Sequence, residues 1–181
     1  VISWAMQLQL VRTVWMIPRV RDALKEVIQG SHFSGTIGED GETIEGNPAL
    51  GYLAKLIMAT AGAPLTSEEI RDQLQAKAAP NVIEYCESLL PDLEAAELLD
   101  AGRAIEQGRK FAVYQEGLVL RGSMMTLLRT GQYGEMRNRA EKLVELSSVI
   151  EESDGLVVKR MDSVQSVKVD WLWPGFLPLG K

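Results

Sequence analysis

Apolar residues recur every three or four positions over most of this chain, which is the spacing of amphipathic helices. The first such segment runs from Trp4 to Val14. Pro18 suits the first turn of a second helix, because its missing N–H would have no helical partner there. Asn47 and Pro48 are the residue types expected at the cap and first position of a third helix. The pattern predicts a bundle of short helices in the first half of the chain.

The clearest helix start in the chain follows Leu65. Thr66 and Glu69 form a capping box, and Leu65 and Ile70 can pack around it as a hydrophobic staple. We therefore expect a fourth helix to begin at Thr66 or Ser67.

Prolines and glycines interrupt the apolar pattern further along. Pro80 opens a fifth predicted helix, and we expect the chain to break and restart at Pro91. From about Arg103 a long, regular pattern follows, although it contains several glycines. Either this arm is broken near Gly102 or Gly108, or the glycines allow another helix to approach closely.

The turn sequence 130–132 separates this long arm from a second one that begins at Tyr133, which predicts an antiparallel αα-hairpin. After Gly155 the residues become β-branched and partly alternating, as in short strands. The predicted fold is mainly α: a helical bundle with a long antiparallel αα-hairpin and a short extended or β C-terminal segment. The expected units are a bundle over 1–100, a hairpin over 101–152, and a linker with the edge of a following domain over 153–181.

Charge is unevenly distributed along the 181 residues, whose formal net charge is −6. Residues 34–100 carry 3 Lys or Arg against 13 Asp or Glu, whereas residues 101–150 carry 8 against 5. Nucleic-acid binding requires a basic surface, so the acidic segment is a poor candidate, and we expect only residues 101–150 to offer such a surface. The Gly-rich acidic loop over 34–46 lacks the full ligand pattern of an EF-hand and is interpreted as a solvated connection.

Cys86 and His32 are the only residues of their types, which excludes an internal disulfide and a His-based metal cluster within the chain. Cys86 occupies a helical apolar position and is predicted to pack in the core.

No signal peptide or membrane-spanning run is evident, so we expect a cytoplasmic protein. The first residues lack an initiator Met and are interpreted as the interior of a longer protein.

The last seven residues, GFLPLGK, fit the first positions of a phosphate-binding P-loop. Pro178 removes one of the backbone amides that such a loop aims at phosphate. The Ser or Thr and the helix that should follow are not in the sequence. We therefore expect no nucleotide site here and no detectable ATP binding.

The segment VDWLWPGFLPLGK resembles the lead-in to the core of RecA-type AAA ATPases found in replication proteins of phages, plasmids and integrated elements. The matching residues are Trp171, Trp173, Pro174, Gly175, Pro178, Gly180 and Lys181. The resemblance implies that this chain stops just before an ATPase core.

The helical part is similar to the N-terminal domain of DnaB-type replicative helicases and to the helicase-binding domain of bacterial primases. The matching marks, besides the hairpin, are Pro18, Phe33, Pro64, Leu65, Thr66 and Leu74. The resemblance implies a non-catalytic assembly domain of a DNA replication protein. Its partner would be a second copy, a primase or a helicase, with DNA contacted through the parent protein.

Three functional hypotheses follow from the hairpin. In the first, its apolar residues form a partner interface, although packing in the core is the more common role of such residues: Phe111, Tyr114, Leu118, Met125, Leu128 and Met136. In the second, the basic hairpin over 103–142 binds DNA, although i,i+4 pairing with Glu also explains its charges: Arg109, Arg121, Arg129, Arg137 and Arg139. The third, a self-contained enzyme, is disfavoured because no carboxylate pair forms a recognisable catalytic frame, and no cofactor is expected.

Overall fold

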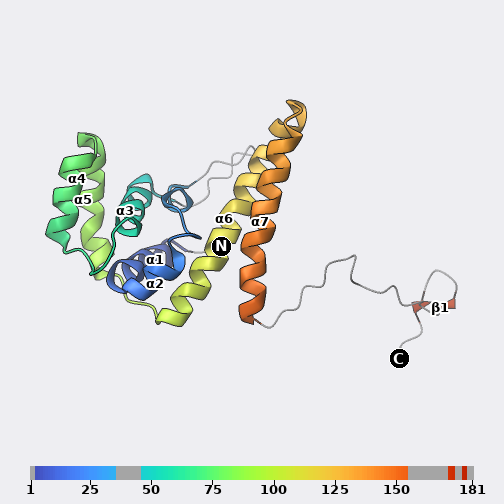
Figure 1. The fold of residues 1–181 in the computed structure, drawn as a ribbon, viewed down its shortest axis with the longest axis horizontal. Helices are drawn as coiled ribbons and strands as arrows, with labels where there is room; N and C mark the ends of the chain where they lie inside the picture. The colour runs from blue at the N-terminus through green and yellow to red at the C-terminus, as the bar shows by residue number, and fades with distance from the viewer. Residues whose placement is uncertain (1–2, 36–45, 155–170, 174–176, 179–181) are drawn as a thin grey trace.

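The computed structural model describes residues 3–35, 46–154, 171–173 and 177–178, and these are mainly helical (Figure 1), which confirms the predicted mainly α class. The helices are α1 Trp4–Met16, α2 Pro18–Leu24, the 3-10 helix η1 Gly30–Phe33, α3 Pro48–Met58, α4 Ser67–Lys77, α5 Pro80–Ala95, α6 Ala101–Arg129 and α7 Tyr133–Asp154. Two short strands, β1 Trp171–Trp173 and β2 Leu177–Pro178, pair antiparallel. Most of the acidic loop and of the GFLPLGK motif lies outside the described residues.

Local capping sets the starts of α3 and α4. The Asn47 side chain accepts a hydrogen bond of 2.8 Å from the Ala49 N–H, with Pro48 in the first turn. At α4, Thr66 Oγ1 accepts from the Glu69 N–H at 3.2 Å, and Glu69 Oε2 accepts from the Thr66 N–H at 2.6 Å. Both halves of the capping box are present, and the predicted start of this helix is confirmed.

The predicted break at Pro91 is wrong. Helix α5 continues through Pro91 to Ala95. Proline removes one backbone hydrogen bond from a helix interior, but the apolar face of α5 is anchored on both sides of it. Leu90 and Leu93 are fully buried, so core packing outweighs the local penalty and keeps the helix continuous.

The core is assembled around α1, which contacts α2, α3, α5 and α6. Fully buried side chains such as Leu10, Val20 and Leu53 come from three helices of this bundle, α1, α2 and α3. Cys86 belongs to the same core, as its sequence position predicts, and burial raises the pKa of its thiol to about 11. The thiol is therefore protonated at neutral pH and acts as a small apolar group.

The long helix α6 is continuous, which decides between the two alternatives for its glycines. A Cβ at Gly108 would lie 2.7 Å from Leu24 Cδ1, so glycine at this position lets α6 pack closely on α2. The buried positions of the first half of α6 end at Gln115, and beyond it only Leu127 is buried. The second half of α6 therefore extends away from the bundle beside α7 (Figure 1).

Two glycines, Gly30 and Gly51, allow the 3-10 helix η1 to lie close against α3. A Cβ at Gly30 would collide with the Gly51 carbonyl oxygen and would approach Lys55 Cβ to 2.9 Å. This contact fixes the position of η1, whose last residues His32 and Phe33 face α6.

Among the described residues, no helix is long and apolar enough to cross a membrane.

Candidate partner-binding site

The predicted interface residues lie on α6 and α7, which pack along each other and are joined through residues 130–132. Phe111 is only 1% exposed and packs on Phe33, with the ring centroids 4.9 Å apart. It belongs to the bundle core because it lies in the half of α6 that packs on the bundle. The interpretation of Phe111 as a partner contact is therefore corrected: it is unavailable to another protein.

The other five predicted interface residues remain accessible to different degrees. Tyr114, Met125 and Leu128 are 39%, 50% and 40% exposed. Leu118 and Met136 are half-buried. These residues leave apolar surface along the α6–α7 pair, as expected where a helix has no further neighbour to pack on.

A groove of about 460 Å³ follows the seam between the two helices. Its lining comes from both of them: Val113, Tyr114, Gly117, Leu118, Leu143, Val144 and Ser147. The lining is almost wholly apolar, and Val144 is 65% exposed on it. Two of the predicted residues, Tyr114 and Leu118, therefore lie together in one surface feature.

Gly117 explains why the seam is open at this point. The nearest side-chain atom to a Cβ placed there would be Leu143 Cδ1, at 4.0 Å. Because glycine contributes no side chain, the space between Gly117 and Leu143 is left as a hollow. Val144 was missed by the sequence analysis, although the adjacent apolar pair Leu143 and Val144 carries the signal, since one helix face cannot bury both.

A polar cluster beside the groove links η1, α6 and α7. The Gln29 backbone N–H donates to His32 Nδ1 at 3.2 Å, so the ring proton lies on Nε2 and is donated to Glu116 Oε1, also at 3.2 Å. Lys142 on α7 donates to the same carboxylate oxygen. The cluster fixes α7 and η1 to the same point of α6.

Burial sets the protonation of this cluster. Burial lowers the pKa of His32 and outweighs the Glu116 carboxylate, which acts in the opposite direction. Burial alone would raise the pKa of Glu116, but the hydrogen bonds from Lys142 and His32 hold it below its usual range. At neutral pH the His32 imidazole is therefore neutral and the Glu116 carboxyl is ionised.

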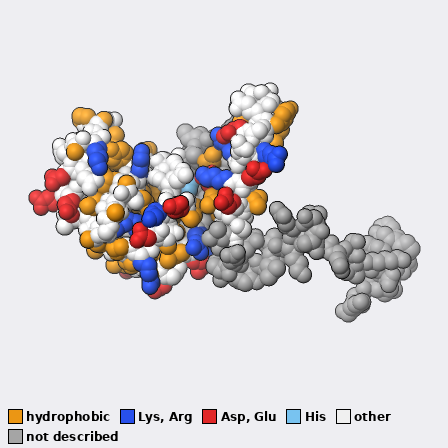
Figure 2. All heavy atoms as spheres, in the orientation of Figure 1, with side chains coloured by type: hydrophobic (Ala, Val, Ile, Leu, Met, Phe, Trp, Pro, Cys, Tyr) orange, Lys and Arg blue, Asp and Glu red, His pale blue; other side chains and the backbone are white. Residues whose placement is uncertain are grey.

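The five arginines predicted to contact nucleic acid differ in their exposure and in their pairing with glutamates. Arg137 pairs with Glu141 at 2.7 Å, and Arg139 pairs with Glu135 at 2.8 Å. Figure 2 shows acidic and basic side chains interspersed over helices α6 and α7. Of the other three, Arg121 and Arg129 are exposed, whereas Arg109 is half-buried. Intrahelical pairing thus accounts for the two arginines on α7.

Among the described residues, no group of three or more His, Cys, Asp or Glu side chains is arranged to hold a metal ion. Comparison of the chain with protein families, curated proteins and solved structures gives no match. The α6–α7 groove is the described feature that best fits the interface predicted from the sequence.

Proposed function

We propose that this chain is a protein–protein assembly domain that associates with a second copy of itself through the α6–α7 groove. The observation that carries the proposal is the concentration of apolar surface, including the 65% exposed Val144, along one helix seam. Apolar grooves between helices are common docking sites, because burial of their lining drives association.

The charge distribution along α7 favours a second copy as the occupant. Residues 133–142 carry Arg137, Arg139 and Lys142 against Glu135 and Glu141, a net charge of +1. Residues 143–154 carry four acidic residues and no Lys or Arg, a net charge of −4. Two α7 helices that run antiparallel across a twofold axis would place the basic half of each opposite the acidic half of the other.

The dimensions suit such an arrangement. Helix α7 has 22 residues and is therefore about 33 Å long. Val144 lies at its midpoint, so the apolar groove would lie at the centre of the interface with charged residues around it. That is the usual organisation of stable interfaces, which bury about 800 Å² on each partner.

In this proposal α6 and α7 act as one antiparallel hairpin that sets the geometry of the assembly. The residues over 153–181 lead from this hairpin toward an ATPase core, on the basis of the lead-in resemblance described above. The parent protein is then a DNA replication protein of helicase or primase–helicase type. In this proposal the present chain binds a second copy and sets the orientation of the assembly, and the ATPase core carries out the chemistry.

Sedimentation equilibrium of the whole chain tests this function. Val144→Asp places a charge in the groove and is expected to weaken self-association about tenfold or more, since central apolar contacts dominate interface energies. Tyr85→Asp is the matched control, because Tyr85 is 68% exposed on α5, away from the groove. Association should also weaken as salt is raised.

Circular dichroism of both variants checks that the helices are intact. A wild-type chain that stays monomeric at high micromolar concentration contradicts the proposal. So does an equal loss of association in Val144→Asp and Tyr85→Asp.

A further inference from the structure

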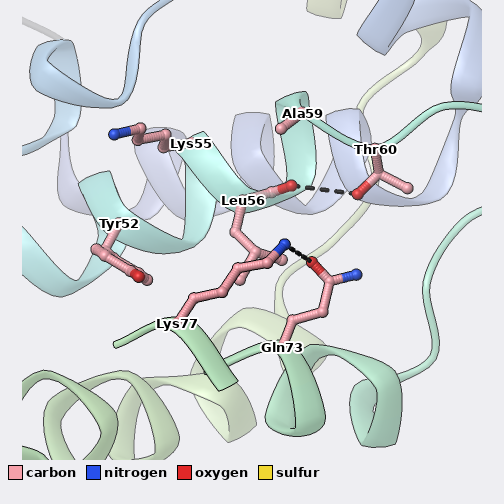
Figure 3. Close-up of a pocket in the computed structure, with 7 residues that line it drawn as sticks. All are labelled: Tyr52, Lys55, Leu56, Ala59, Thr60, Gln73 and Lys77. Carbon is pink, nitrogen blue, oxygen red and sulfur yellow. Dashed lines mark hydrogen bonds between the residues drawn. The ribbon is translucent and has the colours of Figure 1, made fainter. Parts of the chain in front are cut away.

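A second hollow lies between α3 and α4, on elements that the α6–α7 groove does not use (Figure 3). Its volume is about 390 Å³. The residues around it come from α3, from the two positions that follow α3 and from α4: Tyr52, Lys55, Leu56, Ala59, Thr60, Gln73 and Lys77. We refer to it as the α3–α4 cleft.

The cleft exists because α4 packs on α5 rather than on α3. Ile70 and Leu74 are the buried residues of α4, and both are fully covered. Gln73 and Lys77, one helical turn apart, extend instead from α4 toward Leu56 on α3 (Figure 3). Leu56 provides an apolar floor, since it is only 7% exposed.

Two lysines that line the cleft have no ion pair with a carboxylate among the described residues. Five lysines fall within the described residues, and three of them, Lys25, Lys110 and Lys142, form ion pairs with Asp or Glu. The other two, Lys55 and Lys77, have no such partner in the described part of the chain, and both line this cleft. Lys77 Nζ donates only to the neutral Gln73 side chain, at 3.2 Å.

The chain as a whole is acidic, with 25 Asp and Glu residues against 19 Lys and Arg. An adjoining hollow near η1 shares Lys55, but there the second cation, Lys25, already pairs with Asp22 at 3.6 Å. The α3–α4 cleft therefore combines an apolar floor, hydrogen-bonding side chains and two lysines without a carboxylate partner in the described part of the chain. That combination matches an anion with an apolar body.

We propose that the α3–α4 cleft binds a small organic carboxylate. The carboxylate group accepts hydrogen bonds from Lys77 and the Gln73 amide, while the apolar body covers Leu56 and Ala59 beside Tyr52. Lys55 points away from α4 in Figure 3 and lies at the rim, where it attracts the anion without forming the main contact. The volume of about 390 Å³ lies within the range of about 300 to 1,000 Å³ typical of small-molecule sites.

Titration of the 15N-labelled chain with octanoate tests this site, with amide chemical shifts as the readout. Saturable shifts are expected at α3 and α4, and octanol, which lacks the charge, should bind more weakly. Lys77→Gln should weaken octanoate binding about fivefold, the effect of losing one charge-assisted hydrogen bond at a partly exposed site. The matched control is Lys110→Gln, which removes the same charge from α6 and should leave the affinity unchanged.

Three results would overturn the proposal. The first is a set of shifts centred on the α6–α7 groove instead of α3 and α4. The second is an equal affinity for octanoate in Lys77→Gln and the wild-type chain. The third is inorganic phosphate binding as tightly as octanoate, since that would remove the role of the apolar floor. None of these results depends on self-association, so the two proposals fail separately.

Discussion

At the scale of single residues, the contact between Gly30 and Gly51 offers a direct test of the packing. A methyl group at Gly30 meets the Gly51 carbonyl oxygen, a backbone atom that cannot rotate away. Gly30→Ala should therefore lower the free energy of unfolding by about 2 kcal/mol, as overpacked sites do. Urea denaturation followed by circular dichroism measures this change.

Gly134→Ala is the matched control for that substitution. Gly134 lies in the first turn of α7, and a Cβ there would have nothing within 4 Å. Alanine favours the helix, so this variant should be neutral or more stable by up to about 1 kcal/mol. If Gly30→Ala is equally harmless, η1 does not pack on α3 as closely as described.

His32 gives the chain a predicted pH dependence. Its folded-state pKa lies below the ordinary value of about 6.5, so the unfolded state takes up the proton first as the pH falls. Stability is then full above about pH 6.5 and decreases as the pH falls through the folded-state pKa. Protonation of Nδ1 also removes the acceptor of the Gln29 N–H.

Melting temperatures measured between pH 7.5 and pH 5 test this dependence in the wild type and in His32→Gln. The slope should be smaller in the variant, where no imidazole titrates. Glu116, whose pKa is also lowered, contributes its own loss only at more acidic pH, below about 4.5. A wild-type chain that becomes more stable on acidification from pH 7 to pH 5.5 contradicts the described environment of His32.

At the scale of elements, the capping box of α4 is the most local device in the fold. Thr66→Ala removes the side-chain acceptor of the Glu69 N–H and should cost about 1 kcal/mol in a thermal unfolding experiment. Ser88→Ala is a suitable control, because its hydroxyl is exposed and donates only to the Tyr85 carbonyl oxygen of the same helix. Equal effects of the two substitutions would mean that the cap is not formed.

The elements that sequence predicted well are those determined by neighbouring residues. Asn47 and Thr66 act within three positions of themselves, so their caps are visible in the sequence. The prediction at Pro91 was wrong and the role of Gly108 stayed open, because contacts with distant parts of the chain decide both. Gly108 is explained by Leu24, more than eighty positions earlier, and no local pattern carries that information.

At the scale of the whole molecule, the same limit applies to the candidate site. Phe111 and Tyr114 belong to the same helical spacing of apolar residues, yet Phe111 lies in the core and Tyr114 lines the groove. The difference depends on how much of α6 packs on the bundle, which the sequence does not indicate. Lys55 and Lys77 likewise gave no sequence signal, since folding alone brings them to one cleft.

The central claim, a twofold association centred on α7, is tested most directly by cysteine cross-linking. Val144 lies at the midpoint of the 22-residue helix and Tyr133 at its start, and they are 65% and 62% exposed. Across a twofold axis at the midpoint, two copies of residue 144 lie close together. Two copies of residue 133 lie about 33 Å apart, too far for a disulfide.

Cys86 does not interfere with this experiment, because its thiol is buried and its pKa is raised to about 11. Under mild oxidation, Val144→Cys should form a covalent dimer on a non-reducing gel, whereas Tyr133→Cys should remain monomeric. Equal cross-linking of both variants, or none in Val144→Cys, would contradict the proposed assembly.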